Sequence, residues 1–206
     1  MKTTLMTMAA IAAVDARMGF GQCPAVDSES NFDMSRHEGK WFEQQRDKLF
    51  TFEMGQECGT QIYRANAAGN YDLYFRAEIP MMFGQYVGVN GEMSQCGQIP
   101  TSEGSCMATM NGGDKKSPIK ILATDYDNWS VLYACMDMVG GDLMYANWLS
   151  ISTRTNAPIS EEHLMAAHAA IRAQLPLFDL SNWAMYNTTQ GRSCQYDWNI
   201  WETKTF

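Results

Sequence analysis

The sequence predicts an all-β fold: an eight-stranded up-and-down antiparallel barrel, followed by one α-helix packed on the barrel wall. Short segments rich in β-preferring residues recur along the chain. Tight turns such as Ala68-Gly69-Asn70 and Asn111-Gly112-Gly113-Asp114 separate them. One segment with helical spacing of apolar residues comes after the last strand. Because eight strands close around room for one small ligand, the pattern also predicts a cavity.

The elements follow one another with no repeat and no internal domain linker. Residues 23–38 contain Pro24 and scattered polar groups, which predict an irregular lead-in with a helical turn at Asp33–His37. The apolar segment Leu49–Met54 predicts a loop that contacts another molecule. The eight strands are expected at Trp41–Arg46, Glu57–Ala67, Tyr71–Ile79, Gln85–Gln95, Ser105–Met110, Ile119–Thr124, Trp129–Met136 and Leu143–Thr153.

The helix is expected to begin after Ser160, a residue type that caps helix N-termini, with Glu161 and Glu162 in the first turn. Pro176 should end it. Five residues recur at helical spacing and should face the barrel: Leu164, Ala167, His168, Ile171 and Leu175. An edge strand is expected over Trp183–Thr188, and the tail beyond Cys194 has no predicted element.

Residues 1–21 are typical of a secretory signal: Lys2 is followed by a short apolar run and then by small residues. Cleavage after Ala16 and cleavage after Gly21 both fit. The domain is then expected over 22–194, with a tail at 195–206. Without this segment the chain has 13 basic and 22 acidic residues, since Lys2, Arg17 and Asp15 leave with it. This excess of acid argues against nucleic acid or anionic lipid as the main partner.

The cysteines indicate an oxidising compartment, because all six lie beyond the expected signal. An even number behind a signal predicts disulfides, although spacing alone leaves 15 pairings open. Cys96 and Cys106 lie in flanks that read as two strands of a hairpin, which predicts a bridge across it; two free thiols are the alternative.

Three motifs identify a family. Gly39-x-Trp41 lies near the mature start, Thr124-Asp125-Tyr126 about two thirds along, and Arg154 just before the helix. In this order and spacing, with matching cysteines, they resemble the three signature regions of the lipocalins. The sequence is most similar to the branch of apolipoprotein D, bilin-binding proteins and bacterial lipocalins, from Cys23 to about Cys194, with an insertion near Cys96–Cys106.

The resemblance implies roles for these residues. It implies the bridges Cys23–Cys135 and Cys58–Cys194, which leave Cys96 and Cys106 for each other. It implies that Trp41 closes the barrel floor beneath the guanidinium of Arg154, a stack worth about 0.5–2 kcal/mol. Gly39 would allow the tight entry into the first strand, and Thr124-Asp125-Tyr126 would form the turn beside the floor.

Candidate ligand contacts come from strand alternation and from the resemblance. Trp148 shares its side of the eighth strand with Arg154, which is expected to point inward. Tyr63 matches a tyrosine that lines the pocket of similar lipocalins. Tyr74 and Met93 are further candidates inside the barrel. The residues expected near the mouth are Phe52, Met54, Met81, Met82, Phe83 and Tyr86. For each residue, packing without a ligand contact is the alternative; as a set they predict an apolar site for a small molecule.

Other chemistry has little support. His163 and His168 are five residues apart on the helix and His37 is isolated, so no metal site is expected. No phosphate-binding glycine loop or nucleophile elbow is present. Glu43 is the only acid that we can assign to an enzyme acting inside the barrel. Asn187 and Asn128 begin N-glycosylation sequons, Asn187 in the more exposed setting.

The sequence therefore predicts a secreted carrier for one small hydrophobic molecule: a fatty acid, sterol, retinoid, carotenoid, haem or bilin. No cofactor is required, and a bound lipid or pigment would be the ligand itself. Two alternatives remain open. One is an enzyme that modifies lipids or pigments on the same fold. The other is an interaction protein that contacts a membrane or a partner through Leu49–Met54 and the tryptophan-rich tail.

Overall fold

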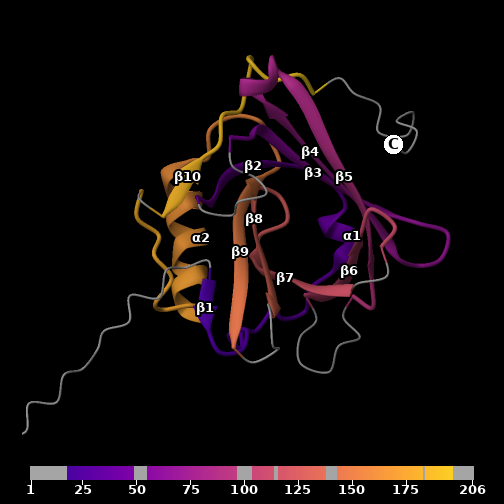
Figure 1. Cartoon of the computed structure of the whole chain (residues 1–206), viewed down its shortest axis with the longest axis vertical. Coiled ribbons are helices and arrows are strands. Elements are labelled where there is room, and N and C mark those ends of the chain that lie inside the picture. Colours follow the sequence, from indigo (N-terminus) through magenta and orange to yellow (C-terminus); the bar gives the residue numbers. More distant parts are fainter. Residues whose placement is uncertain are drawn as a thin grey trace, which may run out of the picture.

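The computed structural model describes residues 18–48, 55–96, 104–113, 116–137, 143–182 and 184–196. Its sheet is antiparallel and closes on itself, because the first and last barrel strands, β2 and β9, are paired with each other. Figure 1 shows the barrel with one long helix on its wall. The predicted fold class is thereby confirmed.

The barrel strands agree closely with those expected. They are β2 (Gly39–Asp47), β3 (Glu57–Ala65), β4 (Tyr71–Ile79), β5 (Gln85–Ser94), β6 (Ser105–Met110), β7 (Lys116–Thr124), β8 (Trp129–Asp137) and β9 (Met144–Thr153). The C-terminal ends of β2, β4, β6 and β8 share one end of the barrel, because the strands alternate in direction. A bulge between Glu43 and Gln45 interrupts the β2–β9 register. Between β4 and β5 the register is continuous, so no bulge forms at Asn90–Gly91.

Four short elements surround the barrel. They are β1 (Met18–Phe20), α1 (Met34–His37), the 3-10 turn η2 (Pro80–Met82) and β10 (Met185–Asn187). The sequence predicted α1 and the edge strand β10, but not β1. Strand β1 lies within the stretch expected to be a signal and pairs with β9 from Met144 to Ala146. The composition of this segment fits both a secretory signal and an edge strand. Its pairing with the free edge of β9 is what defines it as a strand.

Helix α2 (Glu161–Gln174) is capped by Ser160, whose side chain accepts a hydrogen bond from the backbone of His163. It buries Ala167 and Ile171 on the outer face of the barrel, in one cluster with Val131 and Leu149. This apolar layer lies outside the barrel and leaves the interior free for other use. None of the helices in the described ranges is long and apolar enough to cross a lipid bilayer.

The closed end is sealed by Trp41, which is fully buried. The guanidinium carbon of Arg154 lies 3.8 Å from the centroid of its ring. Arg154 also donates hydrogen bonds to the carbonyl oxygens of Arg36, Glu38 and Tyr126. These bonds connect the segment that leads into β2 with the turn that follows β7.

His37 fills the space beneath the barrel floor. Its ring stacks on Trp41 with 4.6 Å between centroids, meets Tyr63 edge-on, and its Nε2 lies 2.9 Å from Ser130 Oγ. Its exposure is 1%. Burial, reinforced by the nearby charge of Arg154, lowers the pKa of His37 to about 3. No local pattern around His37 predicts that its side chain is buried against the barrel floor.

Three disulfides pin the chain to the barrel. Cys23 is bonded to Cys135, Cys58 to Cys194 and Cys96 to Cys106. The first fastens the N-terminal lead-in to β8, the second fastens the segment after β10 to β3, and the third bridges β6 and the segment after β5. No cysteine in the described ranges is free.

Candidate ligand-binding cavity

A cavity of about 410 Å³ lies inside the barrel. Most of its wall is apolar. Strands β4 and β5 contribute Leu73, Phe75, Val87 and Val89. Strands β6 to β9 contribute Met110, Ile119, Leu132, Ala134, Met136 and Ala146. A concave apolar site of this size, with a few polar groups at fixed points, is what small-molecule sites have in common.

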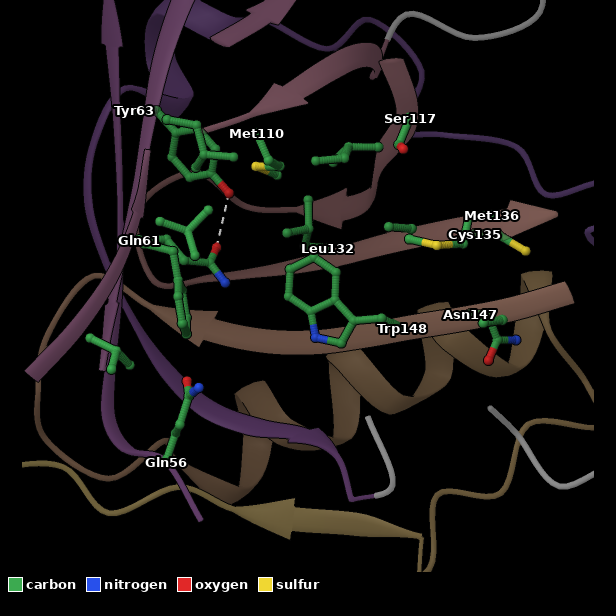
Figure 2. A pocket seen from close by; sticks show the side chains of 17 residues that line it. Gln56, Gln61, Tyr63, Met110, Ser117, Leu132, Cys135, Met136, Asn147 and Trp148 are labelled. Carbon is green, nitrogen blue, oxygen red and sulfur yellow. Dashed lines mark hydrogen bonds between the residues drawn. The ribbon is translucent and has the colours of Figure 1, made fainter. Parts of the chain in front are cut away.

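Two of the predicted contacts, Tyr63 and Trp148, lie on the cavity wall. In Figure 2 the indole of Trp148 projects from β9 into the space, facing β3, the strand that carries Tyr63 and Gln61. Tyr63 is 1% exposed, and burial raises the pKa of its hydroxyl well above the ordinary value. The hydroxyl therefore stays protonated and acts as a neutral hydrogen-bonding group.

The polar groups of the wall lie at two ends. At the inner end the Tyr63 hydroxyl donates to Gln61 Oε1 over 2.9 Å, and Gln61 Nε2 donates to Ser150 Oγ over 3.3 Å. This end adjoins the floor, because Gln61 pairs with Trp41 across the β2–β3 ladder. Ser117 on β7, Asn147 on β9 and Gln56, which directly precedes β3, also line the cavity nearer the other end of the barrel.

The structure does not bring Tyr74, Tyr86 or Met93 to the cavity. Tyr74 lies on the outer face of β4, since Leu73 and Phe75 on either side of it line the cavity. Tyr86 lies on the same outer face, where the guanidinium carbon of Arg76 is 4.1 Å from the centroid of its ring. Met93 is completely buried and packs in the floor cluster with Trp41.

Three further candidates lie at the rim of the barrel. Met81, Met82 and Phe83 are 89%, 50% and 102% exposed at the connection between β4 and β5, so they face solvent rather than the cavity. Phe52 and Met54, and the rest of the loop Leu49–Met54, lie outside the described residues, as do Trp198 and Trp201.

The apolar lining of β4 and β5 was not predicted, but it follows from the pairing register that starts at the β3–β4 hairpin. Ala65 and Tyr71 close the β3–β4 hairpin, which sets Tyr63 opposite Leu73 and Gln61 opposite Phe75. The next hairpin sets Phe75 opposite Val89 and Ala77 opposite Val87. Paired residues share a face of the sheet, so an inward Tyr63 predicts that their partners also point inward. The cavity residues found in this way are Leu73, Phe75, Val87 and Val89. Tyr74 and Tyr86 belong to the opposite phase of the same two strands.

Glu43 does not line the cavity. It is completely buried beside Gly59, where a Cβ would lie 2.9 Å from Glu43 Oε1. The carboxylate accepts hydrogen bonds from Arg46 Nη1 over 2.7 Å and from Thr188 Oγ1 over 3.0 Å. The one acid on which an enzymatic reading depended is therefore part of a buried ion pair. Within the described residues, no group of three or more histidine, cysteine and acidic side chains could hold a metal ion.

The two glycosylation sequons differ in setting. Asn128 is exposed, but Ser130 of the same triplet is buried and contacts His37. Asn187 and Thr189 of the second triplet are both exposed, and Asn187 Oδ1 accepts a hydrogen bond from Gln45.

Comparisons with known proteins agree with the geometry. No family model matches the chain. Apolipoprotein D from Cavia porcellus is 25% identical over 131 residues, which are 58% of this chain and 60% of that protein. Apolipoprotein D from Mus musculus is 27% identical over 140 residues, 66% of this chain and 71% of the relative. The match thus spans less than two thirds of the Cavia porcellus protein.

Solved structures show the same fold. Insecticyanin from the tobacco hornworm Manduca sexta superposes with a TM-score of 0.70 at 18% identity, covering 88% of this chain and 94% of its own. Lobster apocrustacyanin A1 gives a TM-score of 0.67 at 20% identity, covering 87% and 94%.

A closed eight-stranded barrel with a plugged floor, an outer helix and an apolar interior is the architecture of a lipocalin. In sequence the chain is similar to apolipoprotein D, which confirms the resemblance predicted from its motifs.

Proposed function

We propose that this protein is a secreted carrier that binds one small hydrophobic molecule inside its barrel. The observation that carries the proposal is the apolar cavity of about 410 Å³, with Trp148 and Tyr63 on its wall. Burial of apolar ligand surface would supply the affinity, at about 25 cal/mol per Å² before the costs of binding. The three disulfides and the similarity to apolipoprotein D support a secretory or extracellular location.

Titration with N-phenyl-1-naphthylamine, an uncharged probe that fluoresces in apolar surroundings, tests the carrier function. Saturable binding with one site per chain is expected. Ala134→Phe would fill the cavity, because Ala134 faces Ile119 and Trp148 across the neighbouring strands, and should abolish binding. Ala166→Phe adds the same bulk to an exposed position on α2 and should leave binding unchanged. Equal binding by both variants would refute a cavity site.

Solvent extraction of protein from its source, followed by mass and absorption spectra, would identify the ligand.

A second candidate function is contact with an uncharged lipid surface, favoured by the apolar rim. Residues 80–85 contain no charged side chain, and they present Met81, Met82 and Phe83 to solvent. Phe83 also has a left-handed backbone, with φ of 59°, which is unfavourable for a bulky residue. Docking here would place the open end of the barrel against the source of an apolar ligand.

Flotation with phosphatidylcholine vesicles tests this contact. Met81→Ser combined with Phe83→Ser should reduce co-flotation severalfold. Met165→Ser, at a residue 65% exposed on the outer side of α2, is the control and should float like the unmodified protein. No flotation of the unmodified protein would rule out the lipid contact and leave the carrier function untouched.

A further inference from the structure

The inner end of the cavity carries a pair of polar side chains in an otherwise apolar chamber. Figure 2 shows the Tyr63 hydroxyl and the Gln61 amide joined by a hydrogen bond on one side of the cavity, away from Met136 and Asn147. Gln61 is 3% exposed and Tyr63 is 1% exposed, so neither group can exchange its partners with bulk water. A ligand that reaches this end meets two fixed dipoles.

Both side chains retain hydrogen-bonding capacity toward a ligand. The amide nitrogen of Gln61 has two hydrogens, and within the described part of the chain one of them is used, in the bond to Ser150. The Tyr63 oxygen donates its hydrogen to Gln61 Oε1 and keeps its lone pairs as acceptors. The pair therefore offers one donor and one acceptor side by side. A hydroxyl can use both, and a carbonyl oxygen can use the donor.

The same end offers no net charge. No acidic or basic side chain is among the described residues that line the cavity. Arg46 and Glu43 are paired with each other at 2.7 Å. The guanidinium of Arg154 lies against the ring of Trp41 at the floor, where it donates to three carbonyl oxygens, and it does not line the cavity. Arg46 also donates to the carbonyl oxygen of Gln56. A ligand carboxylate at the inner end would lose its hydration without gaining a cation, which is strongly unfavourable.

We propose that the cavity selects an uncharged molecule that enters with a hydroxyl or carbonyl oxygen leading, and that this oxygen binds to Gln61 and Tyr63 at the inner end. The inference rests on the proposed carrier function and narrows its ligand class. Terpenoid or sterol alcohols and ketones fit it. Fatty acids, haem and bilins do not, because their carboxylates would have to remain at the mouth.

Retinol, retinal and retinoic acid test the proposal, because they share one apolar chain and differ only in the terminal group. Displacement of N-phenyl-1-naphthylamine at pH 7.4 should give retinol and retinal an affinity at least about tenfold higher than retinoic acid. Retinyl acetate tests the orientation. If the hydroxyl leads, the added acetyl group collides with the floor and binding is lost; if it trails, retinyl acetate binds as well as retinol.

Variants of the polar pair test the residues. Tyr63→Phe and Gln61→Met should each weaken retinol about five- to tenfold, the usual effect of one lost hydrogen bond. Tyr74→Phe removes a hydroxyl from the outer face of the neighbouring strand and is the matched control. The affinity for N-phenyl-1-naphthylamine, which has no oxygen, reports whether the cavity is intact. It should be unchanged in Tyr74→Phe, and in Tyr63→Phe and Gln61→Met it should fall less than the affinity for retinol.

The outcomes separate this inference from the carrier function. If the naphthylamine probe does not bind, the carrier function fails. If the probe binds, the cavity remains a carrier site, and three results would each refute the proposed recognition by Gln61 and Tyr63. Retinoic acid or retinyl acetate could bind with the same affinity as retinol. Alternatively, Tyr63→Phe and Gln61→Met could both bind retinol as tightly as Tyr74→Phe does.

Discussion

Acidification below pH 6.5 should destabilise the barrel through His37. The pKa of His37 is lowered from 6.5 to about 3, chiefly because the ring is buried and secondarily because Arg154 is nearby. Between these values the unfolded chain binds a proton that the folded chain does not. Stability from neutral His37 is therefore complete above pH 6.5, falls as pH decreases, and stops falling below about 3.

The size of the effect follows from the shift. Each pKa unit corresponds to about 1.36 kcal/mol, so a decrease from pH 6.5 to 4.5 should remove on the order of 2–3 kcal/mol. Urea unfolding with the disulfides intact, at several pH values in this window, measures the loss. Carboxylates also titrate on acidification, so the informative quantity is the difference between the unmodified protein and a variant without this imidazole.

His37→Phe provides that variant, since a phenyl ring can keep the contacts with Trp41 and Tyr63. It leaves Ser130 without its partner and should lower stability at pH 7.5 by about 1–3 kcal/mol, but its stability should depend less on pH. His163→Phe, on the surface helix, is the control and should keep the slope of the unmodified protein. Parallel pH profiles for all three proteins would refute the assignment to His37.

Three further predictions concern the frame of the barrel. Arg154→Met should destabilise the protein by about 3 kcal/mol or more, because it removes the stack on Trp41 and three hydrogen bonds to carbonyl oxygens. Thermal unfolding measures this loss of stability. A loss below about 1 kcal/mol would mean that the barrel floor does not depend on the arginine. Replacing both cysteines of the Cys58–Cys194 bridge by alanine should cost about 5 kcal/mol against about 3 for Cys96–Cys106, because their sequence separations are 136 and 10; denaturant unfolding would contradict this if the order were reversed. We also expect signal cleavage to follow Ala16, because that site keeps β1 paired with β9 whereas cleavage after Gly21 removes β1. N-terminal sequencing decides between the two sites.

Local sequence patterns were sufficient to predict the barrel strands and the outer helix α2. Turn residues mark the hairpins, and Ser160 with Glu161 and Glu162 marks the start of α2, because these signals act within a few residues of the chain. Met18–Phe20 lacked such a signal: its composition suits a secretory leader, and its role as a strand depends on β9, more than a hundred residues away.

The cavity was only partly predictable, for a related reason. Alternation along one strand assigned Trp148, but the phase of β4 and β5 depends on the hairpin that joins β4 to β3. Choosing aromatic residues by type led to Tyr74 and Tyr86, whereas the register from Tyr63 leads to Leu73, Phe75 and Val89. Register is thus better evidence for pocket lining than residue type.

The bulge in β2 shows what local patterns cannot supply. Beyond it, Gln45 pairs with Ile151, which packs in the outer cluster, and Arg46 pairs with Ser150, which contacts Gln61. The extra residue therefore brings Arg46 to the same side as Glu43, three positions away, and allows the two to pair. Without it, strict alternation would place one of these charges outside the barrel and leave the other unpaired inside. The uncharged character of the cavity wall, on which the proposed ligand class depends, thus follows from one inserted residue.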